Sequence, residues 1–147
     1  MHVDTAITSR KSVRRFLDTP VDRATIMHIL QVASRSPSGS NIQPWKVHVV
    51  AGTAKDQLCQ RLLDAVDHGK SDPPEYHYYP QNWFEPYLER RRRCGFGLYA
   101  TLGIGRDDKA KREAQARRNF QLFDAPVGLF ITMDRRLEAG SFMDCGL

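Results

Sequence analysis

Only two segments of this 147-residue chain have the character of β-strands, and they lie far apart in the sequence. WKVHVVA (residues 45–51) alternates Trp and Val with Lys46 and His48, which predicts a half-buried strand. APVGLFITMD (residues 125–134) is almost continuously apolar, which predicts a buried central strand. Two strands are too few for an independently stable sheet. The chain is therefore expected either to lack the C-terminal part of its fold or to complete its core with a partner.

Helical patterns account for most of the remaining sequence. The clearest helix is expected to start at an Asp22 cap and to end near Ser36, because Pro37 disfavours helical geometry in the residue before it. Further helices are expected after an Asp4 or Thr5 cap, after Thr53 paired with Asp56, at Pro86, and from an Asp107 cap to about Gln121. Residues 69–82 hold three prolines and three tyrosines without a period, and are predicted to form a long ordered loop that serves as a lid or binding wall. The order of elements predicts an α+β fold in which helices flank a sheet.

The composition is that of one globular domain, which we assign to residues 1–147. No run approaches the roughly 20 apolar residues that cross a bilayer, and the N-terminal residues lack the apolar segment of a secretory signal. The three cysteines are widely spaced, which argues against a disulfide framework and against a zinc site. The five histidines show no metal-binding spacing either. We therefore expect a cytoplasmic protein without a metal.

Positive charge is concentrated in residues 90–118, where ten Lys or Arg face three acids. The net charge of that segment is +7. Because the net charge of the whole chain is +5, the remaining residues have a net charge of −2. Such a block is typical of a solvated helix face, an anionic-ligand patch or a nucleic-acid-binding surface. The RRRR run at residues 90–93 lies inside a predicted amphipathic helix and lacks the interleaved aromatics of a strand-binding groove. A solvated face or an anionic-substrate patch is therefore favoured over nucleic-acid binding.

SRKSVRRF (residues 9–16) places basic residues on both sides of Ser12. In an extended or irregular backbone, Arg10, Ser12 and Arg14 would point to the same side. Two guanidinium groups and a hydroxyl suit a phosphate, because guanidinium N–H groups match its oxygens in pairs. Taken alone, this cluster is more often a solvated surface.

PSGSNIQPW (residues 37–45) places small residues and two amide side chains between a helix and a strand. Ser38 and Gly39 offer unencumbered backbone amides, and Asn41 and Gln43 offer carboxamides, which together suit a flat polar ligand. The alternative is an ordinary helix-to-strand connection in which Gly39 supplies a positive φ.

GFGLYA (residues 95–100) matches the GxGxxA form of a dinucleotide-binding fingerprint. That motif follows an apolar strand, whereas this segment follows ERRRRC, so the match is rejected. Packing between helices is the preferred explanation for Gly95 and Ala100.

The combination of the basic cluster and the amide-rich loop on either side of one helix resembles the N-terminal half of the nitroreductase family of FMN-dependent oxidoreductases. The matching segments are SRKSVRRF, TPV, ILQVASRSPSGSNIQPWKVHVV and DAPVGLFITMD, and the resemblance covers nearly all of the chain. It implies that the FMN phosphate and ribityl end are held by four residues, Arg10, Lys11, Ser12 and Arg14. It also implies that Pro37, Ser38 and Asn41 approach the isoalloxazine ring, usually from the opposite subunit of an intertwined homodimer.

The same resemblance implies that NAD(P)H is the co-substrate and that a nitroaromatic, a quinone or a related small aromatic acceptor is reduced by ping-pong hydride transfer. No catalytic side chain is expected, because a flavin carries this chemistry itself. YPQNWFEPYLERRRRCGFGLYATLGIGRDD (residues 79–108) resembles the nitrobenzoate-reductase branch, and residues 90–93 are expected to steer a carboxylated substrate. Neither nucleic acid nor a membrane is implied as a partner. The alternatives are a non-catalytic or incomplete flavin-binding protein and, from another class, a basic nucleic-acid-binding module.

Overall fold

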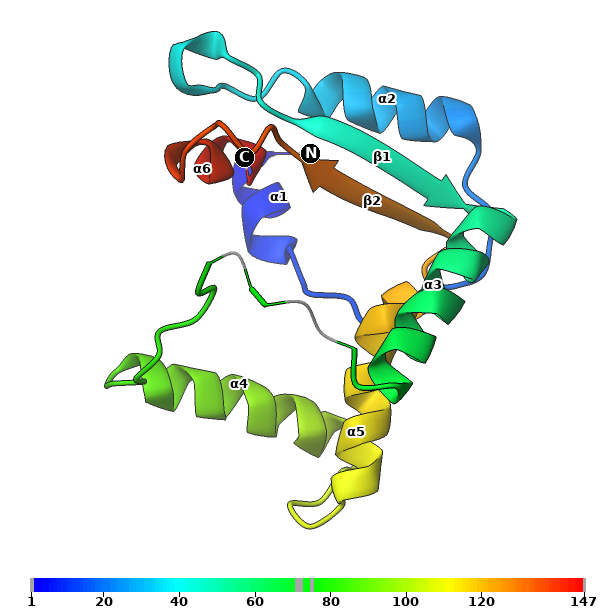
Figure 1. Ribbon diagram of the computed structural model, residues 1–147, viewed down its shortest axis with the longest axis vertical. Coiled ribbons are helices and arrows are strands. Elements are labelled where there is room, and N and C mark those ends of the chain that lie inside the picture. The colour runs from blue at the N-terminus through cyan, green and yellow to red at the C-terminus, as the bar shows by residue number, and fades with distance from the viewer. Residues whose placement is uncertain (1, 71–72, 75, 147) are drawn as a thin grey trace. The chain divides into compact units, whose positions relative to one another are not determined.

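The computed structural model describes residues 2–70, 73–74 and 76–146, which form two compact units: residues 1–59 with 122–147, and residues 60–121. The elements, in chain order, are α1 (Val3–Ser9), α2 (Arg23–Ala33), the 3₁₀ turn η1 (Gly39–Asn41), β1 (Lys46–Ala51), α3 (Gly52–Asp67), α4 (Tyr87–Thr101), α5 (Lys109–Arg117), the 3₁₀ segment η2 (Arg118–Asp124), β2 (Val127–Thr132) and α6 (Gly140–Cys145) (Figure 1). The predicted order of helices and strands and the α+β class are confirmed. In the described ranges, no helix is both long enough and apolar enough to cross a membrane.

The two strands form an antiparallel ribbon in the first unit. Lys46 pairs with Thr132 at one end of the ribbon, and Ala51 pairs with Val127 at the other. Gly128 has little space around it, because a Cβ atom there would lie 2.6 Å from Leu122 Cδ1. A larger residue at that position of β2 would therefore require the Leu122 side chain to shift.

The predicted burial of both strands is wrong for this chain. Val47 and Val49 of β1 are 37% and 41% exposed, and Leu129 and Ile131 of β2 are 47% and 51% exposed. The register puts these four residues on one face, because Val47 pairs with Ile131 and Val49 pairs with Leu129. The apolar pattern therefore marks a real face of the ribbon. It does not report burial, because burial depends on what covers that face.

Helix α2 begins as the sequence predicts. Asp22 occupies the N-cap position and accepts hydrogen bonds from Thr25 N at 2.8 Å and from Thr25 Oγ1 at 2.9 Å. The helix ends at Ala33, earlier than the predicted end near Ser36. The amides of Arg35 and Ser36 donate to carbonyls three residues back, which closes tight turns in place of another α-helical turn.

Three other predicted helix starts need correction. Helix α1 follows a His2 cap, so Asp4 and Thr5 lie within the helix. Helix α3 begins at Gly52, whose φ of +52° turns the chain directly out of β1, so Thr53 is already helical. Helix α5 is preceded by Asp108 in place of Asp107, and it ends at Arg117 instead of near Gln121, because the 3₁₀ segment η2 begins at Arg118. Asp108 Oδ2 accepts from Lys111 Nζ at 2.9 Å, which stabilises the first turn of α5.

Helix α4 of the second unit follows Pro86 as predicted and contains the GFGLYA segment. Its helical conformation confirms that this segment is not a strand-to-helix dinucleotide loop. The predicted packing of another helix at Gly95 is wrong for the part of the chain described, because a Cβ atom there would meet nothing within 4 Å. The predicted loop of residues 69–82 contains no helix or strand among its described residues, while Ser71, Asp72 and Glu75 lie outside them.

Candidate functional site

The basic segment after α1 has an irregular backbone and is exposed throughout residues 10–20. Arg10 Nη1 lies 3.5 Å from Ser12 Oγ, and Arg14 Nη1 lies 3.4 Å from the Ser12 carbonyl oxygen. The structure thus brings both guanidinium groups to Ser12, although both contacts are long for hydrogen bonds. Lys11 lies between them in sequence and is also exposed.

This segment is anchored on its C-terminal side. The backbone amide of Phe16 donates to the Phe123 carbonyl oxygen at 3.2 Å. Phe123 is one of three consecutive residues, Leu122, Phe123 and Asp124, with positive φ values of 52°, 55° and 65°. Non-glycine residues rarely adopt this conformation, which persists only where the surrounding structure enforces it. A strained turn far along the chain therefore fixes the residue that follows the basic cluster.

The amide-rich loop that follows α2 is also strained. Ser40, Asn41 and Gln43 have φ values of 50°, 55° and 48°. The alternative explanation of this loop required a positive φ at Gly39, and Gly39 is not among the glycines with positive φ. Asn tolerates the left-handed region, but Ser and Gln do so at a cost. Strain of this kind concentrates at functional sites, where it holds groups in place before a ligand binds.

Hydrogen bonds hold this loop from inside and from outside. Within it, Ser38 Oγ accepts from Gln43 N at 3.0 Å, and the Ser38 carbonyl oxygen accepts from Asn41 N at 2.9 Å. From outside, Asp144 Oδ1 in α6 accepts from Gly39 N at 3.2 Å, across a separation of 105 residues. The Asn41 carboxamide makes no hydrogen bond with a described residue, so its donors and its acceptor remain available to a ligand.

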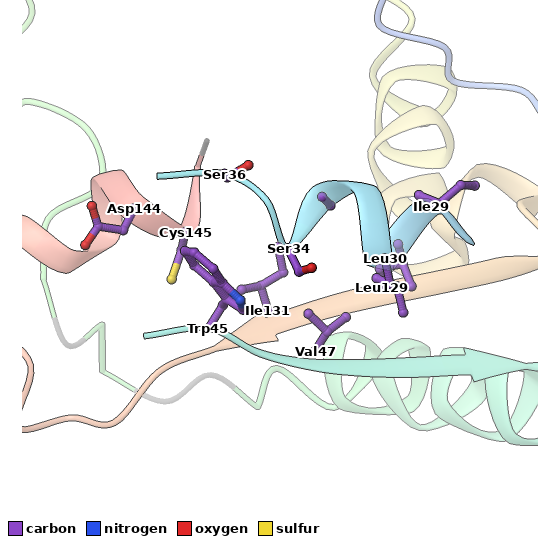
Figure 2. Close-up of a pocket in the computed structure, with 11 residues that line it drawn as sticks. Ile29, Leu30, Ser34, Ser36, Trp45, Val47, Leu129, Ile131, Asp144 and Cys145 are labelled. Atoms are coloured by element: carbon purple, nitrogen blue, oxygen red, sulfur yellow. The ribbon is translucent and has the colours of Figure 1, made fainter. Parts of the chain in front are cut away.

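An apolar cavity lies beside this loop. It measures about 330 Å³ and lies between α2, the strand ribbon and α6. Figure 2 shows Trp45, Val47, Leu129 and Ile131 on the ribbon side of the cavity and Leu30 on the α2 side. None of the seven predicted site residues lines it. The cavity is therefore the uncovered face of the ribbon, whereas the predicted ligand-binding groups lie in residues 10–14 and 37–41.

Two parts of this arrangement were missed by the sequence analysis: the Asp144 contact with Gly39 and the anchoring of Phe16 by Phe123. In both contacts the two residues lie far apart in the sequence, and neither contact belongs to a local motif. Asp144 lies in α6, for which the sequence analysis predicted no helix.

The residues present fit the chemistry of a flavin mononucleotide. Two guanidinium groups and an ammonium group in residues 10–14 complement a phosphate dianion. The loop of residues 37–43 uses the backbone amides of Gly39, Asn41 and Gln43 in its own hydrogen bonds and offers an uncommitted Asn41 carboxamide at a fixed position, which suits the polar edge of a flat heterocycle.

Comparison with known proteins agrees with this fit. The fold is that of the solved FMN- and NADPH-dependent nitroreductase NfnB from Sphigopyxis sp. strain HMH, at 40% sequence identity and a TM-score of 0.94, covering 99% of this chain and 66% of that one. The FMN-dependent nitroreductase NfnB from Mycobacterium smegmatis, solved in complex with NADPH, matches at 30% identity and a TM-score of 0.90, covering 97% of this chain and 64% of that one.

The chain belongs to the Nitroreductase family, whose family model matches residues 7–147. Among curated relatives, it is 41% identical to the nitrobenzene nitroreductase of Ectopseudomonas oleovorans over 98% of this chain, and 38% identical to the 4-nitrobenzoate reductase of Pseudomonas putida, also over 98% of this chain. The predicted family is thereby confirmed. The chain spans 64% of the length of the first of these relatives and 63% of the second.

Proposed function

We propose that this chain forms the FMN-binding part of an NAD(P)H-dependent flavin oxidoreductase that reduces nitroaromatic compounds, quinones or related small aromatic acceptors. The observation that carries the proposal is the presence, in one compact unit, of a basic segment gathered at Ser12 and a strained loop held by Asp144. The first suits a phosphate and the second suits a ring. The names of the relatives, which include FMN- and NADPH-dependent enzymes, support the same conclusion.

In this proposal each predicted residue has a distinct task. Arg10, Lys11 and Arg14 neutralise and orient the phosphate, and the Ser12 hydroxyl donates a hydrogen bond to it. FMN, when bound, supplies the redox chemistry between NAD(P)H and the acceptor, so the protein contributes binding, orientation and electrostatics.

The loop takes the other end of the cofactor. The backbone of Pro37 and Ser38 lies against the ring, and the Asn41 carboxamide hydrogen-bonds its polar edge. Because Ser38 Oγ already accepts from Gln43 N, the Ser38 hydroxyl retains its proton and one lone pair for a ligand.

We further propose that residues 1–147 belong to one nitroreductase-like domain and that two copies assemble as a homodimer, each loop facing the cofactor of the other copy. The family match over residues 7–147 supports the single domain. A cytoplasmic location is proposed on the basis of the three cysteines, which are free, as is usual where thiols are kept reduced.

The test is the visible absorption spectrum of the purified chain after incubation with FMN and desalting, recorded before and after NADPH under anaerobic conditions. We expect a bound-flavin spectrum that bleaches with NADPH and returns when 4-nitrobenzoate or nitrobenzene is added. A flavin spectrum that NADPH leaves unchanged would support the non-catalytic alternative. A colourless protein would contradict the proposed cofactor site.

A further inference from the structure

Lys55 lies at one end of the strand ribbon and joins segments that are distant in the sequence. Ala51, the last residue of β1, pairs with Val127, the first residue of β2. Gly52, with its φ of +52°, turns the chain into α3, so Lys55 lies in the first turn of that helix, beside the residues that precede β2. Its Nζ atom donates to the Ala125 carbonyl oxygen at 3.3 Å, across a separation of 70 residues. The register of the ribbon therefore determines which carbonyl group this ammonium group reaches.

The surroundings of Lys55 favour this contact. The distance of 3.3 Å is long for a hydrogen bond, but the Lys55 side chain is only 15% exposed, so little water competes for the ammonium group. The ammonium group also lies 3.2 Å from Asp56 Oδ1, and the Asp56 side chain is 69% exposed. An ion pair with so exposed a carboxylate contributes little to stability. We therefore attribute the structural effect of Lys55 to its contact with Ala125.

Ala125 closes the strained turn of residues 122–124. Its amide donates to the Leu122 carbonyl oxygen at 3.0 Å, while its carbonyl oxygen accepts from Lys55 Nζ. Ala125 is thus held through both of its backbone polar groups. The three residues before it have positive φ values, a conformation that non-glycine residues keep only where neighbouring contacts enforce it. The Lys55 contact supplies one such constraint at the end of the turn.

The same turn is joined to the basic segment. Phe123, in the middle of the turn, presents the carbonyl oxygen that accepts from Phe16 N, and Phe16 lies two residues beyond Arg14. A change in the backbone of the turn would move this carbonyl oxygen and release the Phe16 amide. The strained turn thus connects the Lys55 ammonium group to the end of the segment that is proposed to bind the FMN phosphate.

From this we infer that Lys55 is a positioning residue for the phosphate end of the cofactor site. By holding Ala125, it keeps the Phe123 carbonyl oxygen where that oxygen can accept from Phe16 N. The side chains of residues 10–14 stay adjustable, while the backbone that carries them is tethered at its C-terminal end. The inference rests on the proposed function for the identity of the ligand, and the tether involves residues of the first unit alone.

The first test measures amide hydrogen exchange of the ¹⁵N-labelled chain without FMN. Lys55→Met removes the ammonium group and keeps an unbranched side chain, and we expect it to speed exchange of the Phe16 amide about tenfold. The Thr25 amide, which donates to Asp22 Oδ1 in the same unit, is the internal reference and should change by less than about twofold. An unchanged Phe16 rate, or equal acceleration of both amides, would overturn the inference.

Two further variants separate the hydrogen bond from the ion pair. Lys55→Arg keeps a charged donor and should hold the Phe16 exchange rate within about threefold of the wild type. Asp56→Asn removes the exposed carboxylate and keeps the Lys55 donor, so it should change that rate by less than about twofold. An effect of Asp56→Asn as large as that of Lys55→Met would show that the ion pair, and not the contact with Ala125, holds the turn. That result would overturn the inference as well.

The second test is FMN titration in a double-mutant cycle with Arg14→Gln. Lys55→Met should lower FMN affinity about fivefold in the wild-type background and by less than about twofold in Arg14→Gln, because both changes act on the same phosphate contact. A merely structural role would lower affinity by the same factor in both backgrounds, and that result would overturn the inference. A wild-type chain that binds no FMN would contradict the proposed function and with it the positioning role, while the Phe16 exchange rate would still show whether the tether exists.

Discussion

The two segments proposed to hold the cofactor are built in opposite ways. The loop of residues 37–43 has three non-glycine residues with positive φ, internal hydrogen bonds and an external tie to Asp144. The basic segment of residues 10–14 is exposed, has no regular structure and gathers at Ser12 through two long contacts. Beyond its end, the backbone amide of Phe16 ties the chain to the Phe123 carbonyl oxygen.

The difference matches the separate requirements of the two ends of the proposed cofactor. A ring must be placed accurately, so it is advantageous to fix the backbone that meets it before binding. A phosphate dianion attracts cations over several ångströms and tolerates adjustable side chains, so the basic segment need not be rigid. Removing positive charge from residues 10–14 should therefore weaken binding of the phosphate. Releasing the backbone of residues 37–43 should weaken binding of the ring.

The largest expected effect is the removal of charge from the basic segment. Arg10→Gln and Arg14→Gln should each lower FMN affinity about tenfold, because each removes a charge-assisted contact with the phosphate. The double variant should lose about a hundredfold if the two contacts are independent. FMN fluorescence titration measures both, and the remaining affinity should depend less on salt.

Arg15→Gln is the control for these variants, because it removes the same charge one residue beyond Arg14 and outside the proposed contacts. We expect its FMN affinity to stay within about threefold of the wild type. A loss as large as that of Arg14→Gln would mean that net charge, and not a phosphate site at Ser12, governs binding.

A smaller effect is expected from releasing the loop. Asp144→Ala removes the acceptor for Gly39 N and should cost about 1 kcal/mol of loop stabilisation, which lowers FMN affinity about fivefold. Asp144→Asn keeps a side-chain oxygen at that position and should restore affinity to within about twofold. Titration with FMN measures affinity, and circular dichroism of the bound flavin reports its placement.

The two Asp144 variants separate position from stability. Urea unfolding of each variant, recorded without FMN, gives the free energy of unfolding. If Asp144→Ala loses FMN affinity only in proportion to a loss of folded protein, Asp144 has a general structural role and does not position the loop. A changed flavin dichroism at full folding would support positioning.

The same two segments show which structural features local sequence can predict and which it cannot. The Asp22 cap and the polar composition of residues 37–43 are local features, and they correctly placed the start of α2 and the connection between α2 and β1. The contact of Asp144 with Gly39 spans 105 residues and has no local signature. The positive φ values of Ser40, Asn41 and Gln43 were missed for the same reason, because long-range contacts overrule the preference for glycine.

The burial of the two strands could not be predicted from local sequence either. The alternation in β1 and the apolar run of β2 identified two strands, and the observed register shows that their apolar residues share one face. The pattern states which residues could be buried together, and it carries no information on what covers them. Val47 and Ile131 pair across the ribbon and yet line an open cavity for this reason.

The smallest effect on binding is expected at the start of α2, which leads into the loop. The hydrogen bonds from Thr25 N and Thr25 Oγ1 hold the pKa of Asp22 below its ordinary value of 3.8. A carboxyl group with a lowered pKa in the folded state stabilises the fold above its unfolded pKa, and this contribution is lost as pH falls through the folded pKa. Asp22→Ala should therefore lower Tm by about 3 °C at pH 7 and by less near pH 3.

FMN affinity of Asp22→Ala should stay within about twofold of the wild type, because Asp144 holds the loop independently of the first turn of α2. Asp18→Ala is the matched control, since Asp18 is an exposed carboxylate outside any helix. Thermal unfolding of both variants at pH 7 and pH 3 checks the stability term. A drop in FMN affinity for Asp22→Ala as large as that for Asp144→Ala would show that the whole of α2 positions the loop. The fixed part of the cofactor site would then begin at Asp22, and the adjustable part would be limited to the basic segment of residues 10–14.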